Sequence, residues 1–219
     1  MSLAQRGFAV GCCNYRLAPE HPFPAQLEDF CGVMQWIYGH ADEYGMNLDH
    51  LCLAGDSAGG HLTGLICAMM TDPSYAGQFP FHLPENFKVA AIGMNCGVYS
   101  PFDENGKPRK TTSEERMEDF LPGVCQDPEK QRQIDVLSLV NADFPPAYIM
   151  SAVGDYLLEQ AGMLEKACRK AGTPYICKIY GSEEKPLYHV FHVDMKNPVG
   201  TLCNDEECTF FRSVFETRR

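Results

Sequence analysis

The run Gly55-Asp56-Ser57-Ala58-Gly59-Gly60-His61 is the most informative part of the sequence, because it places a serine between glycines where an apolar run meets a run of helical period. The apolar residues 51–54 predict a short buried strand, and residues 57–70 predict the helix that follows it. A G-x-S-x-G pattern at this junction is typical of a tight turn that exposes the serine hydroxyl. The two glycines beside the serine would let backbone segments approach where a Cβ atom would clash. We therefore expect Ser57 to be a nucleophile, and the alternative is a turn that only caps a helix.

The rest of the chain alternates strand-like and helix-like runs. Short apolar runs predict strands at 8–15, 51–54, 89–96, 147–153 and 175–180. Helical spacing of apolar residues predicts helices at 24–44, 57–70 and 157–171, and a last one that starts at Asn204 with Glu207 in a capping box. This alternation predicts an α/β fold, with a mostly parallel sheet and helices on both faces. In such sheets the functional residues gather at the carboxyl ends of the strands.

Residues 101–143 interrupt the alternation. Between 101 and 130 the chain is polar and charged, is broken by several prolines, and shows no sustained period. A stretch of this length between regular elements is more often a functional lid than a connector. We therefore predict a single domain, residues 1–219, with a lid-like insertion at about 101–143.

The composition indicates a packed soluble protein, since 45% of the 219 residues are hydrophobic and 21% are charged. The formal net charge of -11 repels phosphate backbones and anionic headgroups, so we expect no nucleic acid and no membrane among its partners. No apolar run reaches the roughly 18 residues of a membrane span. The first residues also lack the basic-then-apolar order of a signal peptide, which predicts a cytoplasmic location.

Eleven cysteines suggest a disulfide scaffold, but their number is odd and most of them lie in apolar stretches. We expect these to be small buried hydrophobic residues in a reducing compartment. They are Cys12, Cys13, Cys52, Cys67, Cys96 and Cys177. No C-x-x-C pair occurs, and Cys203 and Cys208 stand five apart without a second pair, so no metal site is expected.

A serine nucleophile needs a base that takes its proton and an acid that orients the base. Asp155 follows the strand predicted at 147–153 and is the candidate acid, although Asp is also a favoured cap for the helix at 157–171, and both roles can hold. His189, after the last predicted strand, is the candidate base, with His192 as the second choice. Four other histidines lie in less favourable places: His40, His50, His61 and His82.

Two motifs together resemble the hormone-sensitive-lipase-type branch of the α/β-hydrolases. The first is Asn-Tyr-Arg-Leu-Ala-Pro-Glu-His-Pro-Phe-Pro-Ala at 14–25, and the second is Gly-Asp-Ser-Ala-Gly-Gly at 55–60. The resemblance runs from about residue 5 to the end of the chain. It implies an α/β-hydrolase fold that needs no cofactor and that acts on short-chain acyl esters as an esterase or lipase.

By matching position, the resemblance implies a catalytic triad of Ser57, Asp155 and His189, in the chain order of that fold. Val190 replaces the glycine that follows the histidine in the family. Arg16 and Glu20 also match motif positions, which we interpret as scaffold that holds a turn by an ion pair or by hydrogen bonds.

One departure concerns the oxyanion hole. Family members carry an H-G-G-G loop after an earlier strand, and nothing like it precedes Ser57 here. The backbone N–H of Ala58 then remains as one oxyanion donor, and each missing donor lowers turnover by about 10²–10³. The resemblance thus implies a chain that is truncated at its N-terminus. It would lack the first three strands, including the one between its first two predicted strands.

Two functions stay open at this point. The first is a serine carboxylesterase that cleaves small-molecule esters through an acyl-enzyme, with activity impaired by the missing loop. The second is a non-catalytic α/β-hydrolase remnant that serves as a binding module, or an incomplete gene model. A missing central strand would leave strand edges unpaired, which favours a homo-oligomer in either case.

Overall fold

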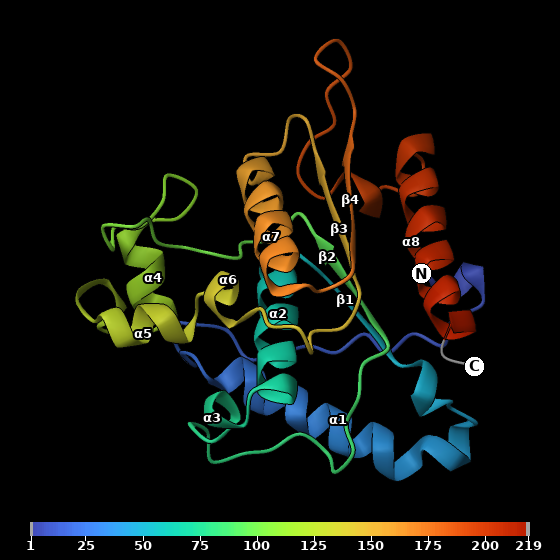
Figure 1. Cartoon of the computed structure of the whole chain (residues 1–219), viewed down its shortest axis with the longest axis horizontal. Coiled ribbons are helices and arrows are strands. Elements are labelled where there is room, and N and C mark those ends of the chain that lie inside the picture. The colour runs from blue at the N-terminus through green and yellow to red at the C-terminus, as the bar shows by residue number, and fades with distance from the viewer. Residues whose placement is uncertain (1, 218–219) are drawn as a thin grey trace.

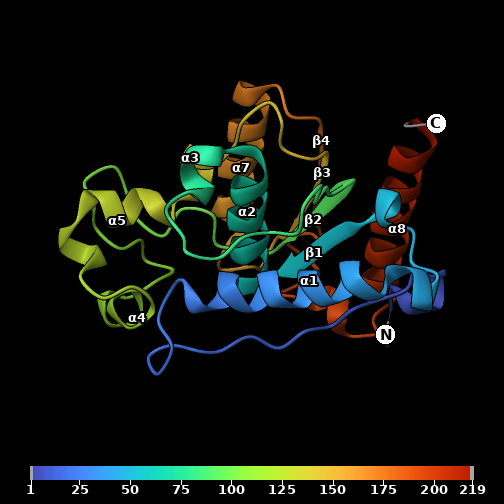
Figure 2. The ribbon, with the colours of Figure 1, turned by 90° about the horizontal axis from the view of Figure 1, so that it is seen from below.

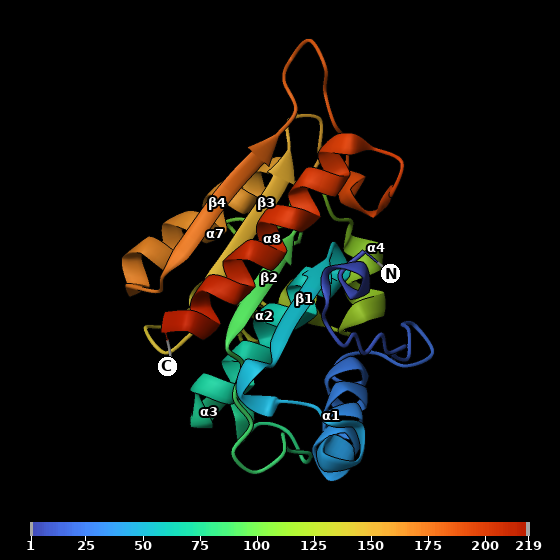
Figure 3. The ribbon, with the colours of Figure 1, turned by 90° about the vertical axis from the view of Figure 1, so that its right-hand side faces the viewer.

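The computed structural model describes residues 2–217 and contains one sheet with helices on both faces (Figures 1 and 3). The strands are Cys52–Asp56 (β1), Ala91–Asn95 (β2), Ala147–Ala152 (β3) and Tyr175–Tyr180 (β4). They lie side by side in chain order, and every neighbouring pair is parallel. All four carboxyl ends therefore meet at one edge of the sheet, and the predicted α/β architecture is confirmed.

The long helices cover the two faces of the sheet. Helices α2 (Ala58–Thr71) and α7 (Leu158–Ala171) lie on one face, and α8 (Pro198–Thr217) crosses the other (Figure 3). Helix α1 (Ala25–Tyr44) packs against α2. Helices α1 and α7 end at left-handed glycines, Gly45 and Gly172. None of the described helices is both long and apolar enough to cross a membrane.

Residues 8–15 do not form the predicted strand and run as irregular coil alongside α1 (Figure 2). Phe8 packs edge-on against Phe211 of α8, whereas Val10 is 44% exposed. An extended segment becomes a strand only when a neighbouring backbone takes up its hydrogen bonds. Within residues 2–217 the sheet has no strand that pairs with this segment, and β1 pairs only with β2. The prediction failed because apolar composition alone cannot supply that partner.

Helix α8 begins at Pro198, not at Asn204 as the capping-box pattern predicted. The side chain of Asn197 accepts hydrogen bonds from the backbone N–H groups of Val199 and Gly200 and caps the helix there. Asn204 lies inside the helix, where its amide donates to the carbonyl of Gly200 at 2.8 Å. An Asn-x-x-Glu spacing occurs both at helix starts and inside helices, so the pattern could not show whether Asn204 begins the helix or lies within it.

The segment 101–143 folds into short helices that project from the side of the sheet (Figures 1 and 2). The helices are α4 (Glu114–Phe120), α5 (Pro128–Gln133) and α6 (Val136–Leu139). Ser113 caps the first and Asp127 the second through side-chain oxygens. That the segment 101–143 acts as a lid stays a prediction.

The shorter elements lie at the ends of larger ones and in the connections between them. They are η1 (Ala4–Arg6), η2 (Leu48–His50), α3 (Pro73–Ala76), η3 (Val124–Gln126) and η4 (Phe191–Val193).

Arg16 holds the first motif onto α1. Its guanidinium donates to Asp29 at 2.8 Å and to Glu28 at 2.5 Å. Arg16 therefore acts as scaffold, as predicted, and its ion-pair partners are these two residues of α1 rather than Glu20 of its own motif.

The cysteines predicted to be buried differ in their exposure. Cys67 and Cys96 are buried, and Cys52 and Cys177 are partly buried. Cys12 and Cys13 are exposed, so the prediction is wrong for this pair. Both residues lie in the 8–15 segment, which is not part of the sheet. No helix layer of the described chain therefore covers their side chains.

Candidate active site

Ser57 occupies the turn between β1 and α2 with a φ of 57° and a ψ of -119°. A positive φ is uncommon for a residue with a side chain, so the backbone is strained here. The Ser57 N–H donates to the carbonyl of Asn95, the last residue of β2, at 3.0 Å. The sharp strand-to-helix turn predicted from G-x-S-x-G is therefore present at the carboxyl edge of the sheet.

Not every glycine around Ser57 is required by space. A Cβ atom on Gly55 would lie 2.2 Å from the carbonyl oxygen of Gly59, and one on Gly60 would lie 3.2 Å from the Cα of Gly97. A Cβ atom on Gly59 would meet nothing within 4 Å. The expectation that the backbone approaches too closely for a Cβ atom is thus right for Gly55 and wrong for Gly59. Gly59 takes part in the close contact only through its carbonyl group, which lies against Gly55.

This difference predicts opposite effects of two matched substitutions. Gly55→Ala must displace the backbone of α2, so we expect it to lower the free energy of unfolding by about 3 kcal/mol. Gly59→Ala places a better helix former in open space and is expected to raise that free energy by up to about 1 kcal/mol. Urea denaturation of both variants checks the prediction. Equal destabilisation by the two changes would contradict this description of the turn.

The structure brings Ser57, Asp155 and His189 into one hydrogen-bonded chain. His189 Nε2 lies 3.0 Å from Ser57 Oγ, and His189 Nδ1 lies 2.9 Å from Asp155 Oδ1. A carboxylate can only accept, so Nδ1 donates to it and Nε2 is left to accept the serine proton. The three residues follow β1, β3 and β4, and parallel strands bring these distant positions to one edge.

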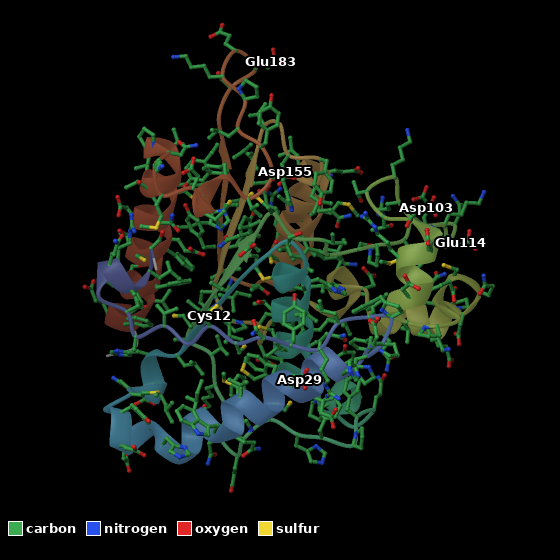
Figure 4. All side chains as sticks on the ribbon, turned by 180° about the vertical axis from the view of Figure 1, so that it is seen from behind. Cys12, Asp29, Asp103, Glu114, Asp155 and Glu183 are labelled. Carbon is green, nitrogen blue, oxygen red and sulfur yellow. The ribbon has the colours of Figure 1, made fainter. Side chains whose placement is uncertain are left out.

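Asp155 is held by two groups besides the histidine. Its side chain has no exposed surface, and Oδ1 also accepts from the Leu157 N–H at 2.9 Å. Oδ2 accepts from the Ser151 hydroxyl at 2.9 Å. Asp155 does not cap α7 as its sequence position suggested, because the helix begins at Leu158 and its N-cap residue is Leu157. The bond that Asp155 accepts from the Leu157 N–H instead closes the turn that leads into the helix, and the same oxygen contacts the histidine. Figure 4 shows Asp155 at the carboxyl ends of the strands, away from Asp103 and Glu114 of the projecting segment.

The other histidines do not join this chain. His192, the second choice for the base, is buried, and its Nδ1 has no hydrogen-bond partner within residues 2–217. Burial lowers the pKa of His192. His61 is also buried and donates from Nε2 to the carbonyl of Ile134 at 2.7 Å, as a packed core residue does. His40 and His50 stack on aromatic rings of α1 and α8.

Two residues at the site escaped the sequence analysis as functional candidates. The Tyr156 ring centroid lies 4.6 Å from that of His189, and its hydroxyl lies 3.5 Å from Nε2. Cys96 is 1% exposed and lies just beyond β2, beside the Asp155–His189 pair. The place of Tyr156 next to Asp155 was a usable signal, whereas no local pattern marks Cys96.

Backbone strain concentrates around these residues. Within the described chain the non-glycine residues with positive φ are Ser57, Asn86, Cys96 and Val190. Three of the four belong to the site or adjoin it. Val190 has a φ of 51° at the position where the family pattern has glycine, and a β-branched residue is unfavourable there. Outliers of this kind cluster at functional sites.

Ala58 stands where the sequence predicts an oxyanion donor. It is the first residue of α2, so its N–H has no acceptor within the helix. The partial positive charge of the helix N-terminus lies at the same point. This geometry can stabilise an anionic oxygen next to the Ser57 hydroxyl.

A buried carboxyl group lies under the turn on the α8 side of the sheet. Glu207 is 2% exposed, and its Oε1 accepts from the Asn95 side-chain amide at 2.9 Å. It fits because Gly93 has no side chain, since a Cβ atom there would lie 2.0 Å from that oxygen. Burial, reinforced by the charge of Asp56, raises the pKa of Glu207 to about 7, against the lowering effect of Asn95.

This shift predicts a pH-dependent stability. Between the ordinary carboxyl pKa of 4.5 and about 7, folded Glu207 keeps its proton while the unfolded chain releases it, so stability falls as pH rises through that window. Glu207→Gln is neutral throughout. As pH rises through the window, we expect the parent chain to lose about 3 kcal/mol of unfolding free energy that the Glu207→Gln variant keeps. Denaturation curves at several pH values measure the difference, and parallel profiles for the two proteins would contradict it.

A cavity of about 610 Å³ lies between the projecting segment and α7, lined by Phe102, Arg109, Leu137 and Met163 among others. Neither Ser57 nor His189 lines it. The expectation that the insertion at about 101–143 acts as a lid therefore stays a prediction.

Comparison with known proteins places this chain in a family. Residues 3–193 match a family model described as alpha/beta hydrolase fold. The carboxylic ester hydrolase LipN of Mycobacterium tuberculosis is 29% identical over 196 residues, which cover 86% of this chain and 51% of LipN. Esterase LipC of the same organism is 29% identical over 167 residues, which cover 73% of this chain and 40% of LipC. The chain thus spans about half the length of the curated relatives it matches.

Solved structures show the same fold. An inhibited esterase B from Lactobacillus rhamnosis superposes with a TM-score of 0.82 at 24% identity, covering 94% of this chain and 66% of the esterase. Esterase LipW from Mycobacterium marinum gives a TM-score of 0.72 at 21% identity, covering 92% and 62%. At such identities the likeness concerns the fold alone. Since the family model matches most of its residues, the chain belongs to the α/β-hydrolase fold family, as its two motifs indicate.

Proposed function

We propose that the protein is a serine carboxylesterase that hydrolyses short-chain acyl esters through an acyl-enzyme on Ser57. The observation that carries the proposal is the hydrogen-bonded chain from Ser57 Oγ through the His189 ring to Asp155, at 3.0 Å and 2.9 Å. The names of LipN and LipC, as an ester hydrolase and an esterase, support the substrate class.

In the acylation half, Ser57 Oγ attacks the ester carbonyl carbon while His189 Nε2 takes the hydroxyl proton. Asp155 keeps the imidazole in the required tautomer and stabilises the imidazolium. The Ala58 N–H and the N-terminus of α2 stabilise the negative oxygen of the tetrahedral intermediate. The bond to the alcohol oxygen then breaks, and His189 returns the proton to the leaving alcohol.

In the deacylation half, a water molecule takes the place of the alcohol. His189 Nε2 removes a proton from the water as its oxygen attacks the acyl carbon. Collapse of the second intermediate releases the carboxylic acid and gives the proton back to Ser57 Oγ. Every proton transfer uses one nitrogen, so the cycle needs no cofactor.

A fluorophosphonate probe tests the proposal directly, because it reacts with an activated serine and forms a stable bond. We expect the mass of the peptide that contains Ser57 to increase by one probe unit. Ser57→Ala should abolish labelling, whereas Ser182→Ala, in an exposed loop, should leave it intact. Release of nitrophenol from 4-nitrophenyl acetate measures turnover on the same samples.

The rival function is a non-catalytic binding module with the same fold. It predicts neither labelling nor ester turnover, even at high protein concentration. That outcome would remove the esterase proposal, whereas labelling confined to Ser57 would remove the rival.

A further inference from the structure

Three different metal-ligand side chains meet behind the proposed nucleophile. The Cys96 sulfur, an Asp155 carboxylate oxygen and a His189 ring nitrogen all lie within 4.8 Å of one another. Cys96 is 1% exposed and Asp155 is 5% exposed. The left-handed backbone of Cys96, with a φ of 48°, carries the thiol at this point just past β2. The esterase mechanism assigns no role to that thiol.

The three groups form a ligand set of known preference. Thiolate and imidazole ligands favour Zn²⁺ and related ions over Mg²⁺ and Ca²⁺, which prefer oxygen ligands alone. In a tetrahedral site, zinc–sulfur and zinc–nitrogen bonds of about 2.3 Å and 2.0 Å place the ligand atoms about 3.5 Å apart. The largest separation, which is up to 4.8 Å, needs to shrink by up to about 1.3 Å, and the 2.9 Å between Asp155 Oδ1 and His189 Nδ1 needs to lengthen slightly. Side-chain rotation can supply both changes. His189 is partly exposed and gives an ion a path from solvent.

We propose that Cys96, Asp155 and His189 bind a thiolate-preferring divalent cation such as Zn²⁺ and that the bound ion switches the triad off. The ion replaces the thiol proton of Cys96, which leaves to solvent, and forms a sulfur–metal bond. It also takes the lone pair of His189 Nδ1, so the ring proton moves to Nε2. A protonated Nε2 no longer accepts the proton of Ser57, and the serine loses its base. The switching part of this inference rests on the proposed function, while the binding part does not.

Cobalt provides the first test, because Co²⁺ occupies zinc sites and reports a thiolate ligand by a sulfur-to-metal charge-transfer band. We expect the full chain to show this band, Zn²⁺ to suppress it by displacement, and Cys96→Ser to abolish it. Cys168→Ser, at another buried cysteine, is the matched control and should retain the band. The double variant Cys12→Ser/Cys13→Ser removes the exposed pair and should retain it as well. A band that survives Cys96→Ser, or that disappears with the exposed pair, overturns the proposal.

X-ray absorption at the zinc edge tests the site without any variant that might fail to fold. With one equivalent of Zn²⁺ we expect one sulfur at about 2.3 Å and nitrogen or oxygen ligands at about 2.0 Å. A shell that contains only nitrogen and oxygen, or several sulfurs, would sink the assignment.

Inhibition is measured as the rate of fluorophosphonate labelling of Ser57 against Zn²⁺ concentration, each variant being normalised to its own rate with a chelator. Cys96→Ala should require at least about 10-fold more Zn²⁺ for the same inhibition. A cobalt band without any labelling of Ser57 would support the metal site and refute the esterase proposal. Labelling of Ser57 without a cobalt band would refute the metal site and support the esterase proposal.

Discussion

His189→Gln is expected to lower kcat for ester hydrolysis by up to about 10⁶-fold. The reason is geometric, since His189 Nε2 lies 3.0 Å from Ser57 Oγ and is the nitrogen that takes the serine proton. A glutamine amide at that place cannot accept and return a proton at neutral pH. Steady-state assays with 4-nitrophenyl acetate, run beside the parent chain, measure the loss.

His192→Gln is the matched control for this prediction. His192 stands three residues further on and was the alternative base on sequence grounds, yet its Nδ1 has no hydrogen-bond partner within residues 2–217. We expect kcat to stay within about 10-fold of the parent, with thermal unfolding as a check on folding. A larger loss in His192→Gln than in His189→Gln would show that the proposed base is wrong.

Asp155→Asn is expected to lower kcat by about 10³-fold, less than the ~10⁴-fold known for an amide that holds the wrong histidine tautomer. The Leu157 N–H donates to Oδ1, the same oxygen that accepts from His189 Nδ1. An amide therefore keeps its oxygen at that position, because its nitrogen there would face two N–H donors. The amide nitrogen then faces the Ser151 hydroxyl, which can accept.

The consequence is that the histidine keeps its tautomer and loses only the charge that stabilises its protonated form. The Nδ1 proton resonance of His189 should therefore persist in the variant, which NMR can show. A loss of that resonance together with a 10⁴-fold or larger drop in kcat would mean that the amide has turned the other way.

The main parts of this site were predictable from the sequence. Residues 51–54 predict a strand, the glycines around Ser57 predict a tight turn, and residues 57–70 predict a helix. Each of these is a local feature that a few neighbouring residues specify, and each is present. Asp155 and His189 each follow an apolar run that becomes a strand. Since parallel strands end at one edge, residues that follow them are expected to lie at that edge. The resemblance to a family is what selects Asp155 and His189 among them.

The failed predictions share a different cause. Residues 8–15 have strand composition but no strand to pair with, and Cys12 and Cys13 are exposed for the same reason. The start of α8 depended on a cap at Asn197 that competes with an equally good pattern at Asn204. In the first case the lack of a partner strand within residues 2–217 decided between strand and coil. In the second case the cap at Asn197 decided between two helix starts with similar local sequence patterns.

The α/β architecture and the turn at Ser57 follow from the sequence alone, because hydrophobic periodicity and glycine placement are local features of the chain. The three residues of the proposed triad are what the resemblance to a family implies. Three further features could be seen only once the chain was folded: the Cys96 sulfur lies beside Asp155 and His189, Glu207 is buried against Asn95, and Gly55 rather than Gly59 must lack a side chain. These features are contacts between segments far apart in the chain. They exist only after the strands align and the helices pack, and packing depends on the whole set of neighbours at once.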